Sequence, residues 1–134
     1  MAGNPLASNV VEGASLTNEL SQKFVIMEGS GSTFPPVRTD KRIVTIGAVQ
    51  PLGKILDFFG EYRIRISDLA ILTLCEEPRA SKEKVDKIIK GINRISPGLK
   101  VIPTVFRTQP LGDISGKKVF VATTAPEEAN SVIR

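Results

Sequence analysis

Uninterrupted apolar runs that alternate with amphipathic segments constrain the fold of this sequence more than any other feature. Residues 24–27 form a continuous apolar run, and residues 69–74 are apolar except for Thr73; both patterns are typical of strands buried on both faces. After the second run, Ser81 can cap a helix in which apolar residues recur at helical spacing up to Ile95. This alternation implies right-handed crossovers between parallel strands. The sequence therefore predicts an α/β fold with a three-layer, doubly wound and mostly parallel sheet.

The other predicted elements continue this alternation. Further strands are expected over 43–49, 99–106 and 117–122, and further helices over 14–22, 51–59 and 126–134. Residues 1–13 and 29–41 are loop-like, the latter because they are rich in Gly, Ser and Pro. We expect residues 1–134 to form a single α/β domain, and because the pattern stops within a helix, a fragment of a larger one.

The residue content limits the chemistry that is open to the chain. Its 134 residues include 18 basic and 14 acidic side chains, a net charge of +4 that suits phosphate ligands, but no histidine and one cysteine. A Ser-His-Asp triad and a zinc site of His and Cys are therefore excluded. Dispersed basic residues without interleaved aromatics predict no nucleic-acid partner. With a lone Cys75, no signal peptide and no membrane-spanning stretch, we expect a cytoplasmic protein without membrane contact.

The first candidate site is the loop that follows the run at 24–27, because ligands of open parallel sheets bind beyond the carboxyl ends of the strands. Glu28 stands at a strand end, where phosphoryl-transfer enzymes commonly hold Mg²⁺, and Gly29 and Gly31 allow backbone N–H groups to face an anion. A flexible turn with a solvated Glu28 is the alternative. Lys41 and Arg42 can hold phosphate groups or can be ordinary surface charges.

A second candidate site follows the run at 69–74. Glu76 and Glu77 can bind a metal ion or tune each other's acidity, but acidic residues just before a helix are the more common reason for such a pair. Cys75 is expected to be packing, because no histidine can activate it. Residues 112–118 look like a Walker A loop, yet they have one spacer too few and precede a strand, so we predict a turn.

A family resemblance rests on several strings that together cover nearly the whole chain in order. They are FVIMEGSGSTFPPVRTD at 24–40, RIVTIGAVQPL at 42–52, FFGEYRIRISDLAILTLCEEP at 58–78, ASKEKVD at 80–86, TVFRTQPLGDISGKKVF at 104–120 and ATTAPEE at 122–128. With these strings the chain resembles the archaeal, largely thermophilic cyclic 2,3-diphosphoglycerate synthetases. The resemblance implies a P-loop NTPase-like, Rossmann-like fold related to dethiobiotin synthetase.

The resemblance also implies an activity and a set of site residues. The family is a ligase that uses ATP and Mg²⁺ to close 2,3-diphosphoglycerate into its cyclic phosphoanhydride. By this likeness Glu28 is the catalytic, Mg²⁺-binding carboxylate. Glu76, from the carboxylate pair after the run at 69–74, is the second metal candidate on its own residues. The remaining implied residues line the phosphates and substrate (Gly29, Ser30, Gly31, Ser32, Thr39, Asp40, Arg42) or border the nucleotide base (Arg107, Pro110, Thr124, Pro126).

The sequence departs from this family in one respect. The family's Walker A loop lies upstream of the region that resembles this chain, and without it the main cradle for the ATP phosphates is missing. We therefore expect part of a ligase that is inactive alone and is completed by an amino-terminal half or a partner chain. The alternatives are a non-catalytic module that binds a phosphometabolite or nucleotide, and a structural homodimer formed through a sheet edge.

Overall fold

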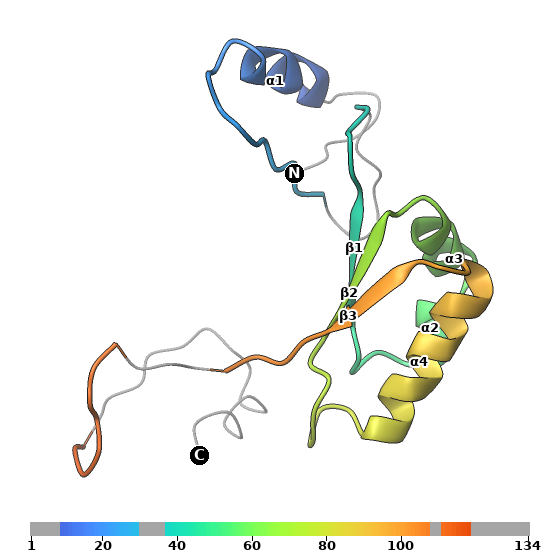
Figure 1. Cartoon of the computed structure of the whole chain (residues 1–134), viewed down its shortest axis with the longest axis vertical. Coiled ribbons are helices and arrows are strands. Elements are labelled where there is room, and N and C mark those ends of the chain that lie inside the picture. Colours follow the sequence, from blue (N-terminus) through green and yellow to red (C-terminus); the bar gives the residue numbers. More distant parts are fainter. Residues whose placement is uncertain (1–8, 30–36, 108–110, 119–134) are drawn as a thin grey trace. The chain divides into compact units, whose positions relative to one another are not determined.

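The computed structural model describes residues 9–29, 37–107 and 111–118 (Figure 1). The chain divides into two compact units, Met1–Asp40 and Lys41–Arg134, and each is described by itself. The first unit contains α1, Val10–Thr17, none of whose residues is buried. This helix begins earlier than the helix predicted over 14–22, so residues 10–13 are helical where we expected a loop.

The strand predicted over 24–27 is not formed, which corrects the sequence prediction. Phe24 and Ile26 are 86% and 92% exposed, and the backbone of this run is irregular. An apolar run becomes a buried strand only when a neighbouring strand satisfies its N–H and C=O groups. The described residues of this unit provide no such neighbouring strand, so the apolar composition of 24–27 was not sufficient to predict a strand.

The second unit is built on a parallel three-stranded sheet in the order β1-β2-β3. In register, Ile43 lies opposite Leu69, and Leu69 lies opposite Lys100. The three strands confirm the predictions over 43–49, 69–74 and 99–106, although each is shorter than predicted. Their bounds are β1 Ile43–Gly47, β2 Leu69–Thr73 and β3 Lys100–Pro103.

Two short helices connect β1 to β2, where we predicted one helix over 51–59. The chain breaks between α2, Leu52–Ile55, and α3, Phe58–Arg65. Asp57 begins the second helix, because its carboxylate accepts a hydrogen bond of 2.7 Å from the backbone N–H of Gly60. Helix α3 lacks a regular apolar stripe, since Phe58 is 86% exposed. The spacing of apolar residues therefore did not predict α3 as a separate helix.

Helix α4, Lys82–Ile95, connects β2 to β3 and confirms the strongest helix prediction. The hydroxyl of Ser81 accepts a hydrogen bond of 3.2 Å from the N–H of Lys84, as expected of an N-cap. Val85, Ile88 and Ile92 are buried on the inner side of this helix. They meet the side chains of the sheet that we call the covered face: Val44, Ile46, Ala70, Leu72 and Val101.

All three helices of this unit lie on the same side of the sheet (Figure 1). Strands that follow one another in space as in sequence, with right-handed crossovers, place their helices on one face. The α/β class and the parallel sheet are confirmed. The third layer of the predicted doubly wound arrangement is not formed by the described residues of this unit, in which the sheet has one helical layer.

The other face of the sheet is therefore uncovered within the described part of this unit. We call it the open face; Ile43 on it is 58% exposed, Thr45 and Lys100 are exposed, and Leu69, Ile71 and Ile102 are half-buried. The alternation along β1 is strict, because Val44 and Ile46 are buried while their neighbours are not. The sheet thus has one packed aliphatic face and one exposed aliphatic face.

Residues 111–118 form the predicted turn and not a P-loop. Asp113 accepts a hydrogen bond of 2.9 Å from the backbone N–H of Ser115, and Gly116 has a φ of 69°. Lys117 and Lys118, which begin the strand predicted over 117–122, are not in a strand. The rest of that strand and the helix predicted over 126–134 lie outside the described residues. Within those that are described, no helix has the length and apolar character needed to cross a membrane.

Candidate functional site at the carboxyl edge of the sheet

The candidate site lies where the three parallel strands end, because the following loops meet at that edge. The loop after β2 carries Cys75 and Glu76, and the segment after β3 carries Thr104 and Arg107. The loop after β1 is held to the sheet by a 2.9 Å bond from the N–H of Ala48 to the carbonyl of Thr73. The topology thus brings the ends of β2 and β3 together.

A hydrogen-bond network fixes the ends of β2 and β3 to each other. The N–H of Thr104 donates to the carbonyl of Leu72 over 2.7 Å, and the N–H of Cys75 donates to the carbonyl of Thr104 over 3.0 Å. Between these bonds Leu74 adopts a φ of 60°, in the left-handed region that non-glycine residues rarely occupy. This conformation turns the chain out of the sheet, so that the next residues form the rim of the site.

Glu76 and Arg107 form an ion pair across this rim. The carboxylate beside the guanidinium raises the pKa of Arg107. Glu76 is the less exposed partner, with 29% of its side chain accessible against 63% for Arg107. Sequence reasoning placed Glu76 in a metal site and Arg107 beside a nucleotide base, and the structure brings these two predicted residues into direct contact.

The start of α4 adds positive potential to the same edge. The carbonyl of Glu76 accepts hydrogen bonds from the N–H groups of Arg79 and Ala80, which leads the chain directly into the helix. In the first turn, the ammonium of Lys84 donates to the carbonyl of Val49 over 2.9 Å. Lys84 therefore joins α4 to the loop after β1, and a helix N-terminus favours anions.

Sequence reasoning did not single out Lys84. Its position three residues after the predicted N-cap Ser81 was the available signal, because that places its side chain at the carboxyl edge of a parallel sheet. Cys75 was predicted to be packing, and it is half-buried with its thiol 3.1 Å from the carbonyl of Leu72. Burial raises the pKa of Cys75, which disfavours the reactive thiolate.

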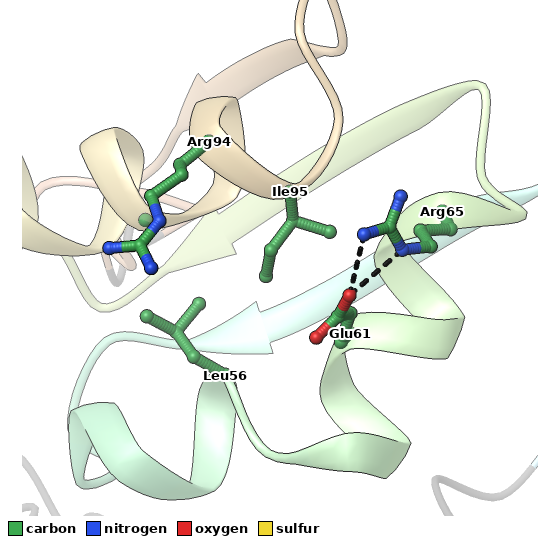
Figure 2. Close-up of a pocket in the computed structure, with 6 residues that line it drawn as sticks. Leu56, Glu61, Arg65, Arg94 and Ile95 are labelled. Carbon is green, nitrogen blue, oxygen red and sulfur yellow. Dashed lines mark hydrogen bonds and ion pairs between the residues drawn. The ribbon is translucent and has the colours of Figure 1, made fainter.

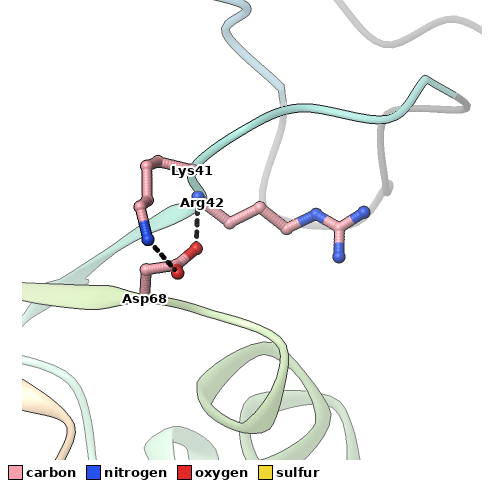
Figure 3. Close-up of polar contacts among 3 residues, drawn as sticks. All are labelled: Lys41, Arg42 and Asp68. Carbon is pink, nitrogen blue, oxygen red and sulfur yellow. Dashed lines mark hydrogen bonds and ion pairs between the residues drawn. The ribbon is translucent and has the colours of Figure 1, made fainter.

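The opposite edge of the sheet carries a separate polar cluster (Figure 3). The carboxylate of Asp68 accepts a hydrogen bond of 2.9 Å from the backbone N–H of Arg42 and one of 3.0 Å from the ammonium of Lys41. These bonds, first the one from Arg42, lower the pKa of Asp68. The guanidinium of Arg42 points away from Asp68 in Figure 3.

Arg42 and Arg107 lie at opposite edges of the sheet, because one precedes β1 and the other follows β3. A five-residue strand separates these edges by about 16 Å at roughly 3.3 Å per residue. The two arginines therefore do not serve the same phosphate group. The sequence prediction of a substrate role for Arg42 concerns a different part of the surface from the rim of Glu76 and Arg107.

The other predicted site residues are only partly described. Glu28, Gly29, Thr39 and Asp40 belong to the first unit, where Glu28 and Gly29 are exposed. The remaining predicted site residues lie outside the described residues: Ser30, Gly31, Ser32, Pro110, Thr124 and Pro126. Within the described ranges, no group of three or more acidic, histidine or cysteine side chains is arranged to hold a metal ion.

A hollow of about 340 Å³ lies in the helical layer, between α3 and the last turns of α4 (Figure 2). Arg65 binds Glu61 on one side of it through a 2.6 Å contact, and Arg94 stands on the other side. Gly91 and Leu56 both line this hollow, and a Cβ at position 91 would come within 2.6 Å of the Leu56 side chain. The last turns of α4 are remote from the carboxyl edge, where that helix begins.

The parallel sheet, its crossover helices and its polar carboxyl edge define an α/β domain of the kind that binds ligands at that edge. The family model described as "Cyclic 2,3-diphosphoglycerate synthetase, P-loop domain" matches residues 1–105. The chain therefore belongs to the cyclic 2,3-diphosphoglycerate synthetase family, which confirms the resemblance drawn from the sequence.

Individual relatives agree with this assignment. The chain is 53% identical over 127 residues to a cyclic 2,3-diphosphoglycerate synthetase of Methanothermus fervidus, covering 95% of this chain and 28% of the relative. It is 48% identical over 133 residues to that of Methanothermobacter thermautotrophicus, covering 99% of this chain and 29% of the relative. A third synthetase, of Methanosphaera stadtmanae, is 45% identical over the full 134 residues and covered to 29%. The chain thus spans less than a third of these relatives.

Proposed function

We propose that this chain is the part of an ATP-dependent ligase that holds phosphorylated substrate during formation of the intramolecular phosphoanhydride of cyclic 2,3-diphosphoglycerate. The observation that carries the proposal is the 53% identity to a synthetase of that name across 95% of the chain. The cytoplasm is the proposed location, because the single Cys75 is a free thiol and requires no oxidising compartment.

The carboxyl edge supports a phosphate ligand. Arg107 offers a guanidinium, Lys84 an ammonium and α4 its N-terminus at this edge. The carboxylate of Glu76 accepts a hydrogen bond from the guanidinium of Arg107 and holds it at the rim. We infer that an incoming phosphate competes with Glu76 for this guanidinium, because charge-assisted bonds from Arg to phosphate are strong and often bidentate.

The carboxylates among the described residues suit Mg²⁺ only if substrate phosphates and waters supply most of its ligands. Magnesium is usually held by one or two carboxylates together with waters and substrate phosphates. The described residues offer no cluster of ligands, and Glu76 is engaged by Arg107. Glu76 is therefore proposed as a single carboxylate of this edge that would meet a Mg²⁺ ion carried by ATP, and such an ion would neutralise phosphate charge. Glu28, in the first unit, is proposed separately as a single Mg²⁺-binding carboxylate on the family resemblance.

The other proposed roles, in both units, rest on the family resemblance. Glu28 is the proposed catalytic carboxylate, and Gly29, Ser30, Gly31 and Ser32 are proposed to line the phosphates. Thr39, Asp40 and Arg42 are proposed to approach the substrate. Pro110, Thr124 and Pro126 are proposed to border the base together with Arg107.

Catalysis by this chain alone is not part of the proposal. The sequence contains no G-x-x-x-x-G-K-[ST] motif, whose backbone and lysine cradle the phosphates in P-loop enzymes. The chain also spans only 28–29% of the relatives cited above. We therefore propose that turnover requires the rest of a synthetase, either in the same polypeptide or in a partner.

Calorimetric titration of the purified chain tests the proposal. We expect 2,3-diphosphoglycerate to bind and MgATP to bind at least tenfold more weakly, since the ATP cradle is absent. Arg107→Gln is expected to weaken binding of the diphosphoglycerate at least tenfold, because it removes a charged hydrogen-bond donor; tenfold corresponds to ~1.4 kcal/mol. Lys90→Gln, which removes an exposed charge on the outer side of α4, is the matched control and should change affinity less than twofold.

A non-catalytic module that binds a phosphometabolite is the second candidate, favoured by the missing Walker A motif. The substitution Glu28→Gln separates the two. In a catalytic role, it abolishes turnover of the reconstituted enzyme while affinity for the diphosphoglycerate is kept. In an anion-binding module, removing the negative charge leaves binding unchanged or slightly stronger, and no turnover exists to lose.

A further inference from the structure

We propose that the ion pair of Glu76 and Arg107 is an exchange contact that couples the binding of a phosphate ligand to the binding of a divalent cation. When a phosphate takes the guanidinium of Arg107, the carboxylate of Glu76 is released and becomes a ligand for the cation. The inference rests on the proposed function, because it takes the ligand of this edge to be a phosphate. It goes further by making Glu76 the residue through which the two ligands strengthen each other's binding.

The first argument is that the ion pair joins two segments whose backbones are fixed independently of it. On one side of Glu76, the N–H of Cys75 donates to the carbonyl of Thr104 over 3.0 Å. On the other side, the carbonyl of Glu76 accepts from the N–H groups of Arg79 and Ala80 over 2.8 and 2.9 Å. Breaking the ion pair therefore requires only side-chain rotation, and the released carboxylate stays at the rim.

The second argument concerns the nitrogen atoms of Arg107. Within the described part of the chain, its guanidinium donates only through Nη1, to the carboxylate of Glu76 and, over 3.3 Å, to the carbonyl of Phe106. A guanidinium presents five N–H donors in a planar fork, and phosphate often binds such a fork through two parallel bonds. A phosphate bound there brings about −1.5 to −2 charges next to Glu76. The two anions repel each other, so the ligand weakens the ion pair from either edge of the fork.

The third argument concerns the carboxylate that is released. Only 29% of the Glu76 side chain is accessible, and a charge that is partly withdrawn from water is stabilised by an opposite charge nearby. Mg²⁺ is usually held by one or two carboxylates together with waters and substrate phosphates. A released Glu76 beside a bound phosphate is such a set of donors. Because the coupling between two ligands is reciprocal, the cation also favours binding of the phosphate.

Calorimetry of 2,3-diphosphoglycerate binding, with and without Mg²⁺ at constant ionic strength, tests the coupling. Without Mg²⁺, Glu76→Gln should tighten binding about fivefold, the upper end for an exposed ion pair, because the internal competitor is gone. Adding Mg²⁺ should improve binding by wild type about threefold or more beyond its effect on Glu76→Gln. Association of Mg²⁺ with the ligand in solution is the same in both titrations and cancels in this comparison.

The matched control is Glu77→Gln. Glu77 is the next residue, is exposed, and forms no ion pair with any residue that the structure describes. Its substitution removes the same charge from the same loop and should change the affinity less than twofold, with or without Mg²⁺. If Glu77→Gln tightens binding as much as Glu76→Gln does, the effect is one of overall charge and the exchange is overturned.

A second experiment needs no phosphate ligand. Mn²⁺, which suits the same oxygen ligands as Mg²⁺, is titrated into the chain and followed by electron paramagnetic resonance. Arg107→Gln releases Glu76 permanently and should tighten Mn²⁺ binding about threefold or more. The double variant Arg107→Gln with Glu76→Gln should lose that gain, which separates release of the carboxylate from the mere removal of a positive charge.

Three results overturn the coupling. They are an equal effect of Mg²⁺ on wild type and Glu76→Gln, Mn²⁺ binding that Arg107→Gln leaves unchanged, and a gain in Mn²⁺ binding that persists in the double variant. The proposed function fails in a different way. If 2,3-diphosphoglycerate binds neither wild type nor Glu76→Gln, the proposed function and the coupling are both refuted, whereas binding with equal effects of Mg²⁺ refutes the coupling only.

Discussion

The two faces of the sheet have similar composition and opposite environments. The covered face and the open face are both aliphatic, yet Leu72 is fully buried on one while Ile71, its neighbour in sequence, is half-buried on the other. A strand with apolar side chains on both sides signals that two layers are needed. The difference shows that the described helices of this unit cover only one of the two apolar sides of β2.

The largest expected loss of stability tests whether side chains on the covered face stabilise this unit more than side chains on the open face do. Leu72→Ala should lower the free energy of unfolding by about 2–5 kcal/mol, because it empties a fully buried position. Ile71→Ala should cost about 1 kcal/mol or less, since its side chain is already half in water. Urea unfolding of both variants gives the measurement, and equal losses would mean that the open face is covered in the chain alone.

Glycine positions give the next largest effect and test the helical layer of the covered face. A Cβ at position 60 would lie 2.0 Å from the backbone carbonyl of Ile55, so Gly60→Ala should cost about 1–3 kcal/mol through forced backbone movement. A Cβ at position 53 would meet nothing within 4 Å, and Gly53→Ala should stabilise the chain by up to about 1 kcal/mol. Thermal unfolding of the two variants should therefore shift in opposite directions.

A smaller effect is expected at the start of α4. Ser81→Ala removes the N-cap bond to Lys84 and should cost about 1 kcal/mol. Ser81→Asp keeps an acceptor at the cap and should restore the stability. Unfolding curves in urea distinguish the two, and a loss in both variants would show that the hydroxyl acts by something other than capping.

The smallest expected effect is the pH dependence of stability that comes from Asp68, at the edge of the sheet opposite the candidate site. The lowered pKa of Asp68 means that its ionised form stabilises the fold above the ordinary pKa of about 3.9, and that this contribution is lost as the pH falls through the lower folded value. Wild type should therefore lose more stability than Asp68→Asn when the pH is lowered from 6 to 3. Parallel losses in the two proteins would show that the bonds from Lys41 and Arg42 do not stabilise the fold.

The sequence predicted those features that depend on local pattern. The spacing of Val85, Ile88 and Ile92 predicted α4, and the four consecutive apolar residues at 69–72 predicted β2. The sequence did not predict α3 as a separate helix, because Gly60 and the exposed Phe58 interrupt the helical spacing of its apolar residues. The strand predicted over 24–27 was wrong, because an apolar run forms a strand only where a neighbouring strand accepts its backbone hydrogen bonds, and composition does not reveal that neighbour.

The sequence predicted which residues lie at the candidate site but not how they contact one another. The rule for parallel sheets pointed to Glu76 and Arg107, and the structure brings them into contact. Their ion pair was not predictable, since it depends on how the loops after β2 and β3 leave the sheet. The contact of Lys84 with the carbonyl of Val49 likewise joins residues 35 positions apart, a separation that periodicity does not address.

Reconstitution of activity tests the central claim most directly. The purified chain, the remainder of the Methanothermus fervidus synthetase and their equimolar mixture would each be incubated with MgATP and 2,3-diphosphoglycerate, and the cyclic product followed by phosphorus NMR. We predict product from the mixture and none from the chain alone. Robust ATP-dependent cyclisation by the chain alone, or a mixture in which the two parts form a complex yet make no product, would contradict the claim that this chain is the substrate-holding part of a synthetase.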